Sequence, residues 1–174
     1  MSETAIDPAV ESPLPPPETR HGSAVTRSRA QVVLHPSRDQ YTKVVQALKA
    51  DGFTMCADLC AVDYLTAATA RPLPDGVAAE RFEVVVNLTN MQSAERVRVR
   101  VQVPAADPSV ASLYEVYPGT EAMEREAWDL LGVSFVGHPD LSRILLPEEW
   151  VGHPLRKDEA TGRIPVQFKS GGSR

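Results

Sequence analysis

The side chains of this chain that could do chemistry crowd into residues 124–159. Both tryptophans, Trp128 and Trp150, lie there among many charged residues, together with two of the four histidines, His138 and His153. Each of these histidines is the centre of a Gly-His-Pro tripeptide. A proline disfavours helical geometry in the residue before it, so we expect both histidines on extended backbone. Such a stretch serves either catalysis or contact with a partner.

Metal binding is the first chemistry to consider, because Cys56, Cys60, His138 and His153 offer two thiolates and two imidazoles. Structural zinc sites usually contain closely spaced pairs of cysteines and of histidines. Here the histidines are far apart, and both cysteines fall on an apolar stripe that we interpret as helical. Buried cysteine commonly acts as a small apolar residue, so we expect no metal site.

Acid–base or nucleophilic catalysis is the second possibility, since Glu124, Glu126 and Asp129 precede the two histidines. On a helix, Glu124 and Glu126 do not share a face. The chain also lacks a nucleophile elbow, a His-Glu-x-x-His motif and the Gly-rich loops that hold phosphates. We therefore expect no catalytic residue in this chain.

RNA binding is an alternative from a different class. Arg96, Arg98 and Arg100 alternate along an expected strand and would form a basic stripe on one sheet face. Sheets that bind single-stranded RNA carry aromatic residues on that face, on which the bases stack. This stripe has none, so a solvated or partner-facing sheet is the favoured interpretation, and salt-sensitive binding to single strands would support the alternative.

The composition is that of a soluble globular protein, with 43% hydrophobic residues, 24% charged residues and a net charge of −5. Two cysteines fit a reducing compartment better than a disulfide scaffold. The N-terminus lacks the features of a signal peptide, and no apolar run reaches the roughly 20 residues of a membrane span. We expect contact with a membrane only through a partner, and no nucleic acid.

The chain divides into three expected parts. Residues 1–29 are rich in proline and polar residues and are expected to be a disordered tail. Residues 30–132 are expected to form an α+β core domain, a small, mostly antiparallel sheet with helices packed on it. Residues 133–174 are expected to form an extended C-terminal arm.

Within the core, residues 31–35 predict a strand, and Ser37 with Gln40 forms a capping box that opens a helix. Gly52 ends this helix. The spacing of Phe53, Cys56, Leu59 and Cys60 predicts a second short helix, and the prolines of residues 67–79 indicate a loop.

Alternation of apolar and polar residues predicts a hairpin of two strands, residues 81–88 and 95–103. A further helix follows, with Thr120 as its N-cap and Gly132 just beyond its end. Its apolar stripe consists of Met123, Ala127, Leu130 and Leu131.

The arm contains repeated prolines and few apolar periodicities, with a turn expected at residues 147–150. An extended arm cannot satisfy its own backbone groups well, so it needs another surface or it stays mobile. Tryptophan and arginine are frequent interface anchors, and the arm therefore indicates an interaction module.

These residues carry a resemblance to a known family. Glu124-Arg125-Glu126, Trp128-Asp129, residues 137–145 and residues 150–158 resemble the signature of the C subunit of NADH-quinone oxidoreductase, a hydrophilic component of respiratory complex I. The upstream stretches around Asp63 and Arg81 are similar to the same family, and the resemblance covers residues 53–158. The aromatic that usually precedes Glu124 is replaced here by Ala122-Met123. A related subunit of a membrane-bound hydrogenase-type complex is the close alternative.

The resemblance implies a non-redox structural subunit at the cytoplasmic face of the bacterial cell membrane, needed for assembly and rigidity of the peripheral arm. It implies no cofactor in this chain, with FMN and iron–sulfur clusters in partner subunits, and contacts with the quinone-site D subunit and with the B and I subunits. The motif residues expected at the partner interface are Glu124, Arg125, Glu126, Asp129, His138, Pro139, Arg143, Trp150, His153, Pro154, Arg156, Lys157 and Asp158. Arg156→Ala is accordingly expected to reduce assembled complex more than it destabilises the chain.

Overall fold

The computed structural model describes residues 18–29, 31–67 and 71–159. It confirms the predicted fold class, a mostly antiparallel sheet with helices packed on it. The main sheet has six strands in the order β1-β2-β3-β6-β5-β4, antiparallel except for the β3–β6 pair. These strands are β1 (Thr19–Arg20), β2 (Ser23–Ser28), β3 (Gln31–His35), β6 (Arg96–Val103), β5 (Phe82–Thr89) and β4 (Met55–Asp63).

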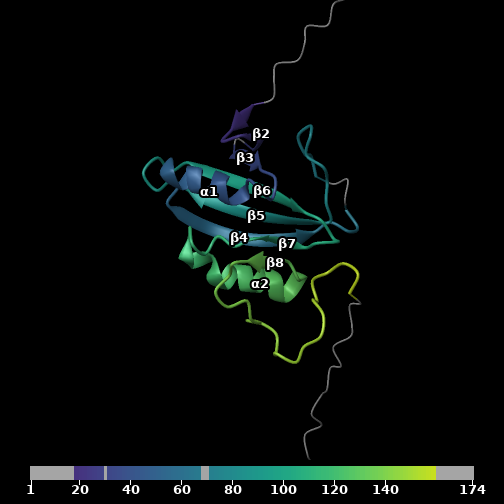
Figure 1. Cartoon of the computed structure of the whole chain (residues 1–174). Helices are drawn as coiled ribbons and strands as arrows, with labels where there is room; N and C mark the ends of the chain where they lie inside the picture. The colour runs from purple at the N-terminus through teal and green to yellow at the C-terminus, as the bar shows by residue number, and fades with distance from the viewer. Residues whose placement is uncertain (1–17, 30, 68–70, 160–174) are drawn as a thin grey trace, which may run out of the picture.

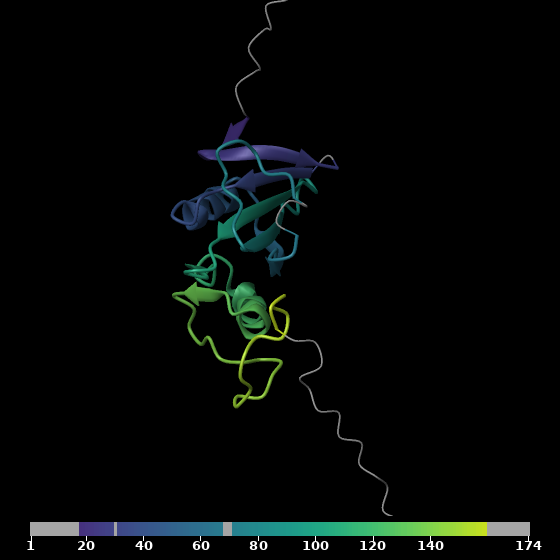
Figure 2. The same cartoon turned by 90° about the vertical axis from the view of Figure 1, so that its right-hand side faces the viewer.

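Helix α1 (Tyr41–Ala50) covers one face of this sheet, as Figure 1 shows. Beyond the β4 edge, a second group of elements packs against β4 (Figures 1 and 2). It comprises helix α2 (Glu121–Leu131), the short helix η1 (Pro118–Thr120) and a two-stranded parallel sheet of β7 (Ser109–Ala111) and β8 (Ser134–Val136). One continuous apolar core joins the two parts, because buried residues of α2 belong to the same cluster as those of the main sheet.

The β5–β6 hairpin confirms the sequence pattern residue by residue. The four valines of β6, from Val97 to Val103, are completely buried, whereas the alternate residues are half-buried or exposed. Tyr41, Val44, Val45 and Leu48 of α1 are buried in the same core. Burial of such side chains is the main force that holds the sheet and helix together, at roughly 1.5–3 kcal/mol for each large apolar side chain.

The predicted short helix over Phe53 to Cys60 is wrong, because this segment forms the edge strand β4. A register shift between Cys56 and Asp58 marks a β-bulge. The bulge inserts one residue, so Cys56 and Leu59 face the same side although three positions separate them. That spacing imitates the helical period, which explains the error.

Residues 19–28, predicted to belong to a disordered tail, instead contain β1 and β2. The tight turn at His21 and Gly22, with φ of 52° and 77°, joins these strands as a two-residue hairpin. Residues 24–28 of β2 then pair with β3. Residues 1–17 lie outside the described residues.

Helix ends match the predicted positions only in part. Helix α1 begins at Tyr41, and no side-chain hydrogen bond caps it, so the predicted Ser37–Gln40 capping box is wrong. Thr120 stands at the N-cap of α2 without capping it through its side chain. Gly132 follows α2 in the left-handed conformation, as predicted.

Candidate functional site: a C-terminal strap on helix α2

Residues 137–159 form a strap that contains neither helix nor strand and folds back over α2, as Figure 1 shows in light green to yellow. The turn predicted at residues 147–150 is present, since the amide of Trp150 donates to the carbonyl of Pro147 at 3.0 Å. Neither His138 nor His153 is helical, as expected from the prolines that follow them. We expected the arm to need a surface outside its own chain. In the described part, residues 137–159 instead lie on α2 of the same chain.

The carboxylate of Asp129 is the centre of the strap's attachment. Its side chain is completely buried on α2. Oδ2 accepts hydrogen bonds from three successive strap amides, those of Ile144, Leu145 and Leu146, at 3.1, 2.8 and 3.0 Å. Oδ1 accepts from the Arg143 guanidinium at 2.5 Å. One helix residue therefore satisfies three backbone donors that would otherwise be orphaned in a segment without secondary structure.

These donors determine the charge state of Asp129. Burial by itself would raise the pKa of a carboxyl group. The amides of Leu146 and Leu145, the Arg143 guanidinium and the amide of Ile144 outweigh that effect and lower the pKa of Asp129 to about 2. The group is thus a carboxylate at any physiological pH and holds the strap as an anion.

Two arginines fasten the strap further. Arg143 also donates to the carbonyl oxygens of Trp150 and Gly152, at 2.7 and 3.1 Å, and so closes the strap on itself. Its guanidinium lies 5.6 Å from the centre of the Trp128 ring. Arg125 reaches from α2 to the carbonyl oxygens of Ser142 and Arg143, at 3.1 and 2.9 Å. Each guanidinium thereby satisfies backbone acceptors that have no partner in a helix or strand.

The rings of both histidines form hydrogen bonds within the chain. His138 bonds through Nε2 to the carbonyl of Glu121 at 3.1 Å, and its Nδ1 accepts from the amide of Asp140. His153 bonds through Nδ1 to the carbonyl of Asp129 at 3.0 Å. The two rings thus attach the strap near the two ends of α2. Because they lie at different ends of the helix, they do not form a shared site for a substrate or a metal ion.

Arg156 covers the C-terminal end of α2. Its Nε donates to the carbonyl of Leu131 at 2.7 Å, and the amide of Leu155 donates to the carbonyl of Leu130 at 3.0 Å. The last carbonyls of a helix have no partner within it, and a cation is favourable at this end of the helix dipole. Gly132 makes the approach possible, since a Cβ on it would lie 2.5 Å from the Arg156 guanidinium.

The end of the strap is attached to the main sheet. Asp63 at the end of β4 accepts from the Arg81 guanidinium at 2.9 Å and from the amide of Lys157 at 2.9 Å. Arg81 in turn pairs with Asp158 at 2.6 Å. Burial opposes the charged form of Asp63, but these donors together with the amide of Leu65 lower its pKa below the usual range.

Glu124, on the opposite side of α2 from the strap's centre, is also completely buried. It accepts from the Ser112 hydroxyl at 2.6 Å, the Leu113 amide at 2.7 Å and the Thr120 hydroxyl at 3.1 Å. Burial raises the pKa of Glu124, although these hydrogen bonds act in the opposite direction. The carboxylate therefore ties the segment before α2 to the helix.

The predicted interface residues thus fall into three groups. Glu124 and Asp129 are completely buried within the chain, so contact of their residues with a partner stays a prediction. The half-buried Arg125, His138, Arg143, His153 and Arg156 lie at the contact between strap and core, and Trp150 is half-buried within the strap. The exposed side chains are those of Glu126, Pro139, Pro154, Lys157 and Asp158.

Three residues of this site were not predicted as site residues, namely Asp63, Arg81 and Ser112. Asp63 and Arg81 stand in the upstream stretches that resemble the family, which is the signal that could have identified them. Ser112 lies outside those stretches, in a short connection after β7. No local pattern marks it as the partner of a carboxylate twelve residues away.

The strap region exposes several apolar side chains. Val151 is 93% exposed, and the remaining exposed apolar residues are Val136, Ile144, Leu145 and Leu155. Contiguous exposed apolar side chains are typical of surfaces that bind other proteins. Several polar groups of the strap are thus used within the chain, while these apolar side chains face outward among exposed charged residues such as Asp140, Glu148 and Glu149.

Metal-holding side-chain groups and membrane-spanning helices are absent from the described residues. Within residues 18–29, 31–67 and 71–159, no group of three or more histidine, cysteine or acidic residues could hold a metal ion. Cys56 is half-buried and Cys60 is exposed, contrary to the buried stripe expected from the sequence. No helix in this part of the chain has the length and apolar character needed to cross a membrane.

Comparisons with known proteins identify the family. Residues 34–163 match the family model described as the respiratory-chain NADH dehydrogenase 30 kDa subunit. A curated relative, the C subunit of NADH-quinone oxidoreductase from Salinispora arenicola, is 37% identical over 148 residues, which are 83% of this chain and 56% of the relative. The chain therefore spans just over half the length of that relative.

Two solved structures are similar in fold. A trypsin-resistant fragment of Nqo5 is 32% identical, with a TM-score of 0.60, and the match covers 69% of this chain and 90% of the fragment. A chain of an archaeal membrane-bound sulfane sulfur reductase, a respiratory membrane complex, is 19% identical with a TM-score of 0.65, covering 84% of this chain and 86% of that one. The second likeness concerns the fold alone. The matched residues, the identity with the Salinispora relative and the shared fold together place this chain in the family of the respiratory-chain NADH dehydrogenase 30 kDa subunit.

Proposed function

We propose that this chain is a non-redox structural subunit of a proton-pumping NADH:quinone oxidoreductase. In this proposal it joins and stiffens the peripheral part of the enzyme at the cytoplasmic face of the bacterial membrane. Its partners are the quinone-site D subunit and the neighbouring B and I subunits, and FMN and the iron–sulfur clusters belong to partner subunits. Two cysteines are too few to hold an iron–sulfur cluster with four thiolates, which supports a role without electron transfer.

The observation that carries the proposal is that hydrogen bonds inside the chain hold the strap while several of its apolar side chains stay exposed. Asp129, Arg125 and Arg143 use their hydrogen-bonding capacity inside the chain. Leu145 and Val151 remain 60% and 93% exposed on the same segment. A segment held rigidly from within binds a partner without a further loss of conformational entropy, which favours tight association.

The exposed apolar residues give a sharper test than the arginines. Arg156 contacts the end of α2 and lies 5.3 Å from the centre of the Phe82 ring. Arg156→Ala therefore weakens the fold of the chain together with any interface. Leu145→Glu and Val151→Asp instead place a charge where the isolated chain is already exposed to water.

We expect both variants to lower the amount of assembled enzyme in membranes and its NADH:quinone reductase activity by at least about tenfold, since a desolvated charge at an interface costs more than about 2 kcal/mol. The urea midpoint of the isolated chain should stay unchanged. Leu65→Glu is the matched control, because Leu65 is 47% exposed and lies outside the strap.

Normal assembly and activity of Leu145→Glu and Val151→Asp would contradict a docking role of the strap. The subunits that copurify with the chain test the wider proposal. Copurification of an NADH-oxidising flavoprotein would support the proposed function. Copurification of a nickel-containing large subunit would instead indicate the hydrogenase-type complex. The RNA alternative gains no support from the geometry, because Arg98 and Arg100 pair with Asn87 and Glu83 of the neighbouring strand.

A further inference from the structure

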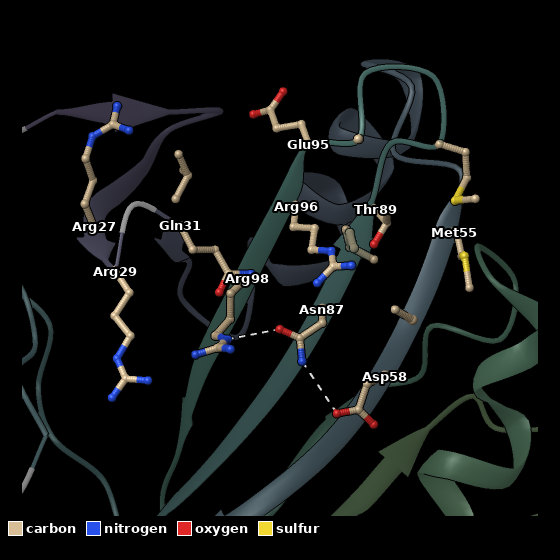
Figure 3. Close-up of a pocket in the computed structure, with 15 residues that line it drawn as sticks. Arg27, Arg29, Gln31, Met55, Asp58, Asn87, Thr89, Glu95, Arg96 and Arg98 are labelled. Atoms are coloured by element: carbon tan, nitrogen blue, oxygen red, sulfur yellow. Dashed lines mark hydrogen bonds between the residues drawn. The ribbon is translucent and has the colours of Figure 1, made fainter.

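A second surface of the molecule is not used by the strap. It is a groove on the face of the main sheet opposite α1, with a volume of about 1070 Å³. Figure 3 shows that Asp58, Asn87 and Arg98 point into it from three adjacent strands, with Arg27 and Arg29 along one side and Met55 on the other. Asn87 and Arg98 alternate with fully buried core residues, which confirms that they face away from α1.

The groove and the strap lie at opposite ends of the β4–β5 pair. Met55 pairs with Thr89 at the groove end, whereas Asp63 pairs with Phe82 at the end where the strap is attached. A partner bound in the groove would therefore contact the chain at a place separate from the strap.

The groove is cationic although the chain as a whole has a net charge of −5. Four arginines line it, Arg27, Arg29, Arg96 and Arg98, against two carboxylates, Asp58 and Glu95. Arg27 pairs with Glu18 at 3.2 Å, and Arg98 donates to Asn87 at 3.0 Å. Within the part of the chain that the structure describes, Arg29 and Arg96 have no ion-pair partner, so they are available to an external anion.

Apolar side chains stand beside these cations. Met55 and Met91 are 46% and 65% exposed, and both line the groove. Methionine is flexible and polarisable, and it is common at surfaces that accommodate another chain's apolar side chains. Among the described residues, no aromatic side chain lines the groove, so it lacks the stacking platform that single-stranded nucleic acids need.

We propose that this groove binds an extended, acidic segment of another protein subunit of the same assembly, with carboxylates at Arg29 and Arg96 and an apolar side chain between Met55 and Met91. Charge complementarity selects the segment, and the two methionines bind its apolar residue. This proposal rests on the proposed function, because the partner belongs to the complex that the strap joins. The chain would then be held at two separate surfaces.

The test uses the purified complex, with photoreactive benzoylphenylalanine in place of Met91. We expect the crosslink to fall within an acidic segment of one other subunit. In the Arg29→Glu/Arg96→Glu background, crosslinked product should drop by at least about tenfold, because like charges then face each other. Reversal of the acidic residues of the crosslinked segment to lysine should restore the product.

Lys43→Glu is the matched control, since Lys43 is exposed on α1, on the other side of the sheet. It should leave the crosslink unchanged. A crosslink to a segment without acidic residues, to nucleic acid, or to no molecule at all would overturn the groove proposal. If any of these crosslinking results came with a normally assembled complex, the proposed function would stand and only the groove proposal would be refuted. Failure of the unaltered chain to copurify with any NADH-oxidising enzyme would instead refute the proposed function itself.

Discussion

Asp129→Asn is the substitution that most directly tests how the strap is held. The change keeps the size of the side chain but removes its charge. The Arg143 guanidinium, 11% exposed, loses its ion pair, and an amide group is brought against donors that need an acceptor. Removal of one partner from a buried ion pair costs about 3–5 kcal/mol.

The pKa of Asp129 gives an independent magnitude. A fall from the usual 3.8 to about 2 corresponds to about 2 kcal/mol of stabilisation, at about 1.4 kcal/mol for each pKa unit. The expected loss at pH 7 is therefore about 2–5 kcal/mol, a large part of the roughly 5–15 kcal/mol that stabilises a typical domain.

The pH dependence follows from the direction of the shift. A carboxyl group whose pKa is lowered by folding stabilises the protein above its unfolded pKa, and this contribution disappears as the pH falls through the folded value. The difference between the wild type and Asp129→Asn should thus be constant above about pH 5 and shrink between about pH 4 and pH 2.

Two measurements on the full chain check this prediction. Urea unfolding followed by tryptophan fluorescence reports the global loss, and hydrogen exchange at Ile144, Leu145 and Leu146 reports release of the strap. Asp140→Asn is the control, because Asp140 is an exposed acid of the same segment. Equal urea midpoints and unchanged exchange at the three amides would refute the role assigned to Asp129.

Two further predictions concern α2. Gly132→Ala should destabilise the chain by about 1–3 kcal/mol more than Gly76→Ala, as measured by urea midpoints. Both glycines have positive φ, but only at Gly132 would the new Cβ clash with neighbouring side chains, those of Arg156 and His153. Equal midpoints would show that the strap shifts aside without strain. Glu124→Gln should change the pH profile of stability: burial raises the pKa of Glu124, so the wild type loses stability as the pH rises above 4.5, the usual value. The variant should lack this loss, and parallel profiles between pH 4 and pH 8 would contradict it.

Local pattern predicted those parts of the fold whose partners are close in sequence. The valines of β6 and their polar neighbours identify the hairpin because alternation alone determines which face is buried. The bulge at residues 56–58 removed that signal from β4, and the proline-rich residues before Glu18 concealed β2. A pattern that is interrupted by one inserted residue, or that borders on a tail of biased composition, cannot be recognised locally.

The site was predictable as a set of residues but not as an arrangement. The crowded charges and prolines of residues 124–158 mark an ordered segment. Asp129 lies on the polar side of α2 in the sequence pattern, and only the fold shows that the strap covers that side. The partners of Asp63 are separated from it by up to 94 residues, a distance over which no periodicity carries information.

The contacts of Lys157 and Asp158 with Asp63 and Arg81 also affect folding during synthesis, because residues 63 and 81 are made before residues 157 and 158. Strand β4 leaves the ribosome long before residue 157, so the Asp63 carboxylate has an incomplete set of donors until the end of the strap arrives. At roughly 5–20 residues per second, that interval lasts several seconds. A chain cut before residue 157 would keep this edge of the sheet unfinished. Completion of the strap therefore distinguishes chains that extend past residue 158 from chains that stop before residue 157, before either meets a partner.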